Sequence, residues 1–122
     1  MLVVDDKEEN RLVMRDLLEI PGIEVEMAEN GYECIDKAVK TMPDLIFMDL
    51  VMPKMNGFEA AEKIKKMKQL ENIPVIAVSA SFMNISNIKE KGFDAFLSKP
   101  LDTDELFAVL KKYLPVECGM GI

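Results

Sequence analysis

The chain has 122 residues and a formal net charge of −7 at pH 7, with 49% hydrophobic and 30% charged residues. This length and balance fit one globular domain with one core and exclude a disordered chain. The acidic charge disfavours direct binding of nucleic acid. Because the sequence contains no histidine, Ser-His-Asp, Cys-His and histidine-ligated metal chemistry are also excluded.

The apolar runs and the cysteines indicate a cytoplasmic location. The longest apolar runs have four or five residues, far fewer than a membrane span requires. Asp5 and Asp6 follow the first run directly, so we expect no signal peptide and no membrane contact by this domain. Cys34 and Cys118 have neither CxxC nor metal-ligand spacing, and we expect free thiols in a reducing compartment.

Five short apolar segments, partly β-branched, predict β-strands. They are 1–4, 25–28, 45–48, 74–78 and 95–97. Turn signals such as Asn30-Gly31 and Asn56-Gly57 separate them from longer segments with helical periodicity. Continuous apolar strands that alternate with helices are typical of a parallel sheet covered on both faces.

The segments between the strands predict helices. The segment after Asp6 has an apolar face of Val13, Leu17 and Ile20. In 31–42 and 57–70 the apolar residues also recur at helical spacing: Ile35, Ala38, Val39 and Met42 in the first, Ala60, Ile64 and Met67 in the second. The segment 81–93 predicts a weak helix, since it contains two asparagines and two serines. The last helix is expected from near Asp102, which can cap it, to before Pro115.

This order predicts an α/β domain of the flavodoxin-like class. We expect a doubly wound, five-stranded parallel sheet in the order 2-1-3-4-5 with five helices, although five βα units alone do not fix that order. The expected domain covers 1–114, followed by a C-terminal tail at 115–122.

Polar side chains that could carry chemistry follow the first, third, fourth and fifth predicted strands. They are Asp5 and Asp6 after the first, Asp49 after the third, Ser79 after the fourth, and Ser98 and Lys99 after the fifth. Ligands of such sheets bind beyond the carboxyl ends of the strands, so these side chains should meet at one edge.

Three neighbouring carboxylates repel one another, and a bound divalent cation would relieve that repulsion. Carboxylates, main-chain carbonyls and water are ligands suited to Mg²⁺. Lys99 would add a positive charge and Ser79 a hydroxyl donor around an anion attached to Asp49. A carboxylate held between a metal and a lysine is a credible nucleophile towards phosphorus, giving an aspartyl phosphate.

The segments "LVVDD", "MDLVMPKMNG", "VSA" and "LSKP" occur in this order on the predicted elements. Together they resemble the receiver domain of two-component response regulators, over nearly the whole chain. The resemblance implies that Asp49 is the phosphoacceptor and that Asp6 and Asp49 bind Mg²⁺ directly. It further implies metal contacts from Asp5 through water and from the Val51 carbonyl.

The same resemblance assigns the remaining site residues. Lys99, Ser79 and the Ala80 amide would contact the phosphoryl group, and the Lys99-Pro100 bond would be cis. Phe96 stands at the family's switch position, so Ser79 and Phe96 would move inward on phosphorylation. Such a domain catalyses its own phosphorylation and dephosphorylation and is not a conventional turnover enzyme.

The implied partner is a histidine kinase or a histidine phosphotransfer protein. The output surface would be the face of the fourth helix, fifth strand and fifth helix, which is also a candidate homodimer interface. The segment "DDKEENR" resembles receivers attached to hybrid sensor histidine kinases, so a module excised from such a kinase is one alternative. A pseudo-receiver that only binds partners is another.

Simpler interpretations stand beside these. Asp5 and Asp6 could merely cap the first helix, Phe96 could be plain core, and Asn10 and Arg11 are expected to be solvated helix residues. A phosphohydrolase of the haloacid-dehalogenase type would need a second aspartate at position 51, which is valine. A flavodoxin-type cofactor carrier would need a Ser/Thr/Gly-rich phosphate loop after the first strand.

Overall fold

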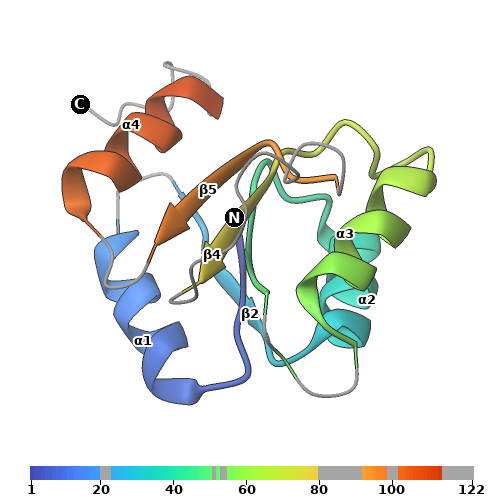
Figure 1. Cartoon of the computed structure of the whole chain (residues 1–122), viewed down its shortest axis with the longest axis horizontal. Coiled ribbons are helices and arrows are strands. Elements are labelled where there is room, and N and C mark those ends of the chain that lie inside the picture. Colours follow the sequence, from blue (N-terminus) through green and yellow to red (C-terminus); the bar gives the residue numbers. More distant parts are fainter. Residues whose placement is uncertain (20–22, 51, 53–54, 80–91, 99–101, 114–122) are drawn as a thin grey trace.

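The computed structural model describes residues 1–19, 23–50, 52, 55–79, 92–98 and 102–113. Within these ranges the chain alternates strands and helices (Figure 1). The strands are β1 (Leu2–Val4), β2 (Glu26–Ala28), β3 (Ile46–Asp49), β4 (Val75–Ser79) and β5 (Ala95–Ser98). The helices are α1 (Glu8–Leu17), α2 (Gly31–Thr41), α3 (Gly57–Lys66) and α4 (Thr103–Tyr113).

The five strands form one parallel sheet in the order β2-β1-β3-β4-β5, as predicted. Strands β1, β3 and β4 are buried along their whole length. This explains why their sequences are continuous apolar runs, since both faces of a doubly wound sheet are covered by helices. The partly exposed strands β2 and β5 form the two edges.

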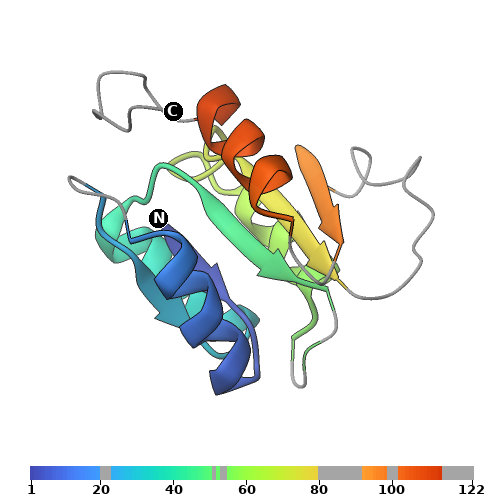
Figure 2. The ribbon, with the colours of Figure 1, turned by 90° about the vertical axis from the view of Figure 1, so that its left-hand side faces the viewer.

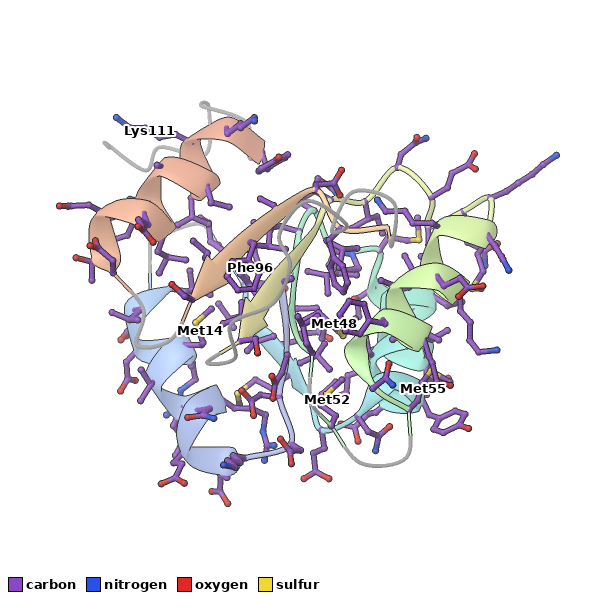
Figure 3. All side chains as sticks on the ribbon, viewed as in Figure 1. Met14, Met48, Met52, Met55, Phe96 and Lys111 are labelled. Atoms are coloured by element: carbon purple, nitrogen blue, oxygen red, sulfur yellow. The ribbon has the colours of Figure 1, made fainter. Side chains whose placement is uncertain are left out.

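Helices α1 and α4 lie on one face of the sheet, and α2 and α3 lie on the other (Figures 1 and 2). Two apolar clusters fill the two interfaces. Met14, Phe47 and Leu106 belong to the cluster under α1 and α4. Met48 and Ile64 belong to the cluster under α2 and α3 (Figure 3). Each face therefore has its own core, and the sheet separates the two.

The helix count is confirmed only in part. Four helices are present in the described part of the chain, and α4 is the last of the predicted helices. The weak helix predicted over 81–93 falls almost entirely within 80–91, outside the described residues. The predicted C-terminal tail at 115–122 and residue 114, the predicted end of the domain, also lie outside the described residues. Among the described helices, none has the length and apolar character that crossing a bilayer requires.

The expected apolar face of α1 is confirmed only in part. Leu17 is half-buried and packs against the cluster under α1 and α4, whereas Ile20 lies outside the described residues. Val13 is 55% exposed, whereas Arg11, Met14 and Leu18 are buried. The buried face thus includes Arg11, which the periodicity counted as polar. In α2, Val39 and Met42 are likewise exposed, and Cys34 and Ala38 are buried.

The third helix is shorter than its apolar period predicts. Helix α3 ends at Lys66, and Met67 adopts extended backbone angles. Turns follow as far as Ile73, with Leu70 buried among them. The apolar spacing therefore continued past the helix because the turn also contributes a core residue.

Candidate functional site

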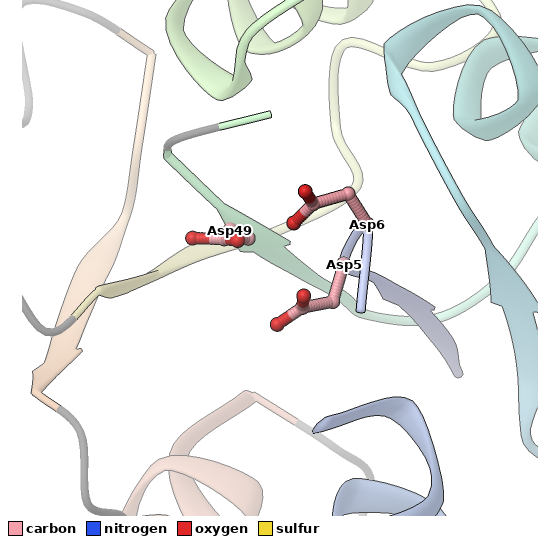
Figure 4. A group of neighbouring side chains, drawn as sticks. All are labelled: Asp5, Asp6 and Asp49. Atoms are coloured by element: carbon pink, nitrogen blue, oxygen red, sulfur yellow. The ribbon is translucent and has the colours of Figure 1, made fainter. Parts of the chain in front are cut away.

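Three carboxylates meet at the carboxyl end of the sheet. Asp5 and Asp6 follow β1, and Asp49 ends the neighbouring strand β3. Val4 is paired in register with Met48, so the ends of the two strands are level. One carboxylate oxygen from each of the three aspartates lies within 4.8 Å of the other two (Figure 4). The predicted convergence of these side chains is therefore present.

The donor set of this cluster fits a hard divalent cation. Asp5 and Asp49 are 5% and 7% exposed, and both line one pocket. Negative charges held together under such conditions repel strongly unless protons or a cation compensate them. Carboxylate oxygens are the ligands that Mg²⁺ prefers, and it retains several waters when only part of its shell is protein. The cluster could hold one such ion.

Asp5 is held in place by the beginning of α1. Its Oδ1 accepts hydrogen bonds from the Lys7 amide at 2.9 Å and from Asn10 Nδ2 at 3.4 Å. Helix α1 begins at Glu8 after Lys7, and no side-chain hydrogen bond caps it in the described structure. Simple helix capping by Asp5 and Asp6 therefore does not account for the acidic pair.

Ser79 and Phe96 occupy the strands next to Asp49. Ser79, at the end of β4, is 1% exposed and is paired with Ser98 of β5. Asp49 is paired with Val78, so Ser79 lies one residue beyond it at the same edge. Phe96 is half-buried and packs against the cluster under α2 and α3 (Figure 3). Ser79 is thus at the acidic edge, and Phe96 packs against the core next to it.

Comparison with known proteins identifies the family. The sequence model for the response regulator receiver domain matches residues 1–111. The chain belongs to this family. The receiver is 37% identical over 116 residues to the polar-differentiation response regulator DivK of Brucella anthropi, covering 93% of this chain and 94% of DivK.

Solved receivers have the same fold. The chemotaxis protein CheY4 of Vibrio cholerae is 30% identical, with a TM-score of 0.84 over 93% of this chain and 96% of that one. The receiver domain of the sensor histidine kinase PA1611 from Pseudomonas aeruginosa is 26% identical, with a TM-score of 0.83 over 92% of this chain and 93% of that one. The latter structure has a magnesium ion coordinated in its active site cleft.

This membership decides the class of function. The protein is a phosphoacceptor receiver domain of two-component signalling, and its class of partner is a histidine kinase or a phosphotransfer protein. The phosphohydrolase, the flavodoxin-type carrier and the pseudo-receiver are not favoured by these relatives. The roles of individual residues remain predictions.

Several predicted site residues fall outside the described residues. These are Val51, Ala80, Lys99 and the Lys99-Pro100 bond. By contrast, Asp5, Asp6, Asp49 and Ser79 are all placed at the carboxyl edge of the sheet.

One residue near the site was misjudged from the sequence. Arg11 was expected to be solvated, yet it is 9% exposed, and its Nη1 donates to the Asp5 carbonyl oxygen at 2.7 Å. Its spacing from Met14 and Leu18, three and seven residues further on, could have indicated the buried face. Hydrophobic periodicity misses such a position because it treats every arginine as polar.

Proposed function

We propose that this receiver catalyses transfer of a phosphoryl group from a phosphohistidine donor onto Asp49, with Mg²⁺ bound by Asp5, Asp6 and Asp49. The observation that carries the proposal is the meeting of three carboxylates within 4.8 Å at the carboxyl edge of the sheet. A carboxylate oxygen of Asp49 attacks phosphorus, and the phosphorus–nitrogen bond of the donor breaks. The electron pair of that bond leaves on the imidazole nitrogen of the donor.

The neighbouring residues orient this reaction. Asp5 and Asp6 hold their carboxylates beside Asp49, and the Val51 carbonyl is a further metal ligand in the proposal. The metal neutralises charge on the phosphoryl oxygens when bound. Ser79, the Ala80 amide and Lys99 would bind the remaining phosphoryl oxygens, by resemblance to the family.

The phosphorylated state is proposed to act as a switch. Ser79 would bind the phosphoryl group, and Phe96 would repack inward, which shifts the population between two conformations. The face around β5 and the last helix would then change its affinity for a partner in the cytoplasm or for a second copy of the receiver. Hydrolysis of the acyl phosphate would return the domain to its first state.

The test is the mass of the intact protein after incubation with acetyl phosphate, with and without Mg²⁺. We expect a Mg²⁺-dependent gain of one phosphoryl group, and no gain in Asp49→Asn, which keeps the shape of the side chain without its charge. Lys99→Ala and Asp6→Asn should retain Asp49 and slow the gain. Phosphorylation of Asp49→Asn at the wild-type rate would show that the acceptor is a different residue.

A further inference from the structure

Arg11 is a buried charge that the proposed reaction does not use. Four polar or charged residues are buried in the described part of the chain: Asp5, Asp49, Ser79 and Arg11. The first three belong to the proposed site. A buried guanidinium is costly unless it is paired and hydrogen-bonded. The position of Arg11 therefore requires an account of its own.

The two terminal nitrogens of Arg11 connect the ends of two strands. Its Nη1 donates to the carbonyl oxygen of Asp5, at 2.7 Å, just beyond the end of β1. Its Nη2 lies 3.6 Å from Oε1 of Glu29, the residue after β2. A planar guanidinium can serve both partners at once, whereas the single nitrogen of a lysine cannot match that geometry.

The rest of Asp5 is held by the same region. Its amide donates to the Ala28 carbonyl oxygen of β2 at 3.1 Å. Its Oδ1 accepts from the Lys7 amide and from Asn10 Nδ2. The amide, the carbonyl and the carboxylate of Asp5 are thus all fixed, and Arg11 supplies the bond to the carbonyl. The next peptide unit leads directly to Asp6, so the direction of this carbonyl also affects where Asp6 points.

We propose that Arg11 is a positioning residue, which orients the Asp5-Asp6 segment and so raises the affinity of the acidic site for Mg²⁺. Glu29 fixes the other side of the guanidinium, and Asn10 supports the carboxylate of Asp5. The inference rests on the proposed function, since it concerns the same metal site. It adds two residues, Arg11 and Glu29, that do not touch the metal or the phosphoryl group.

Positioning and simple electrostatics predict opposite effects. If only the charge of Arg11 mattered, its removal would leave the site more negative, and Mg²⁺ would bind more tightly. If Arg11 positions the aspartates, its removal weakens binding, and lysine does not restore it. Residues that orient metal ligands in this way change metal affinity by about 10- to 100-fold when they are mutated.

The experiment measures the initial rate of phosphorylation by acetyl phosphate against Mg²⁺ concentration, by intact mass, for wild type, Arg11→Gln and Arg11→Lys. We expect the half-saturating Mg²⁺ concentration to rise about tenfold or more in both variants. The rate at saturating Mg²⁺ should stay near that of wild type, because Asp49 is intact. A general loss of folded protein would lower the maximal rate and leave half-saturation unchanged.

Arg15→Gln is the matched control. Arg15 lies on the same helix, and its side chain is 53% exposed, with Nε 4.0 Å from Oδ1 of Asp16. Arg15→Gln should leave the half-saturating Mg²⁺ concentration unchanged. If Arg11→Gln does not fold, Arg11→Lys carries the test, because it keeps the positive charge: electrostatics alone predicts an unchanged half-saturating Mg²⁺ concentration, and positioning predicts a higher one.

A half-saturating Mg²⁺ concentration that is unchanged or lower in the folded Arg11 variants would overturn the positioning role. That result would leave the proposed function intact, provided that wild type requires Mg²⁺ and Asp49. A wild-type protein that is phosphorylated without Mg²⁺, or not at all, would instead overturn the proposed metal-assisted transfer.

Discussion

A Cβ atom at Gly57 would clash with the carbonyl oxygen of Asp49, so the first residue of α3 is packed directly against the main chain of the proposed phosphoacceptor. The Gly57 amide also donates to the Leu50 carbonyl oxygen at 3.2 Å. The start of α3 therefore packs against the main chain of Asp49 and Leu50. A side chain at position 57 has no room, because the atoms that it would meet belong to the backbone.

Gly57→Ala should displace the end of β3 and slow phosphorylation. We expect a loss of about 1–3 kcal/mol in the free energy of unfolding, as for other overpacked sites. Gly31→Ala at the start of α2 is the comparison, because the three atoms nearest to its Cβ would be side-chain atoms of the buried Met55 and not backbone atoms of Asp49. Chemical denaturation and the acetyl phosphate assay would compare the two. Equal slowing of phosphorylation in both variants would contradict a specific role for the backbone contact with Asp49, whatever their losses of stability.

The strands and the acidic cluster were predictable, while the contacts that fix the cluster were not. Each carboxylate follows an apolar run, so the parallel topology alone brings Asp5 and Asp49 to one edge. The strand order was inferred from the flavodoxin-like fold class, because five βα units alone do not fix it. The bond of Arg11 to Asp5 and the approach of Gly57 to Asp49 depend on tertiary packing, which no local pattern contains.

Asp94 should stabilise the opposite end of the sheet. Its Oδ2 accepts from the Val75 amide at 2.8 Å and from Lys65 Nζ at 3.2 Å, and its carbonyl oxygen accepts from the Tyr113 hydroxyl at 3.1 Å. Asp94→Ala removes the carboxylate partner of the Val75 amide. We expect a loss of about 1–3 kcal/mol in the free energy of unfolding. The Mg²⁺ dependence of phosphorylation should not change, because these contacts lie at the amino end of β4.

Lys65→Met separates the ion pair from the bond to the Val75 amide. The Lys65 and Asp94 side chains are 25% and 37% exposed, so solvent weakens their attraction, and we expect the ion pair to contribute about 1 kcal/mol or less. A double-mutant cycle of Lys65→Met and Asp94→Ala, followed by urea denaturation, measures the coupling energy between the two side chains. Lys65→Met also removes the hydrogen bonds from Lys65 Nζ to the Ile73 and Glu71 carbonyl oxygens, at 2.9 and 3.4 Å, so only the coupling energy reports on the ion pair. A coupling energy as large as the whole loss in Asp94→Ala would show that the ion pair, rather than the bond to the Val75 amide, dominates.

Cys34 should give the receiver an alkaline limit of stability. Burial raises the pKa of the Cys34 thiol from 9.0 to about 12. Between these values the unfolded chain has lost the thiol proton and the folded chain still holds it. Stability therefore falls as pH rises above 9, by up to about 1.4 kcal/mol per pH unit for one proton. Below pH 9 the thiol is protonated in both states and contributes no slope.

Urea denaturation from pH 8 to pH 11 measures this effect in a Cys118→Ser background, which leaves Cys34 as the only thiol. Cys34→Ala in the same background should show a shallower decline with pH. In the folded protein Cys34 should also react slowly with a thiol reagent at neutral pH, and rapidly in urea. Parallel pH profiles for the two proteins would mean that the Cys34 thiol loses its proton over the same pH range in the folded and unfolded states, which contradicts the prediction.

Phe96 should couple phosphorylation to β5 without affecting the chemistry. The side chain is half-buried against the cluster that contains Met48 and Ala77, one strand away from Ser79. It can therefore gain or lose packing area when its surroundings change, without a hydroxyl to form a hydrogen bond in either rotamer. Phe96→Ala should be phosphorylated at the wild-type rate, because Asp5, Asp6 and Asp49 are untouched.

The measurement is amide hydrogen exchange over β5 and α4, before and after phosphorylation, in wild type and in Phe96→Ala. We expect protection to change on phosphorylation in wild type and to change much less in the variant, since the packing that distinguishes the two conformations is gone. Phe96→Leu, which keeps an apolar side chain, should give an intermediate response. If the wild-type response persists in full in Phe96→Ala, Phe96 is part of the core and Ser79 acts through another side chain.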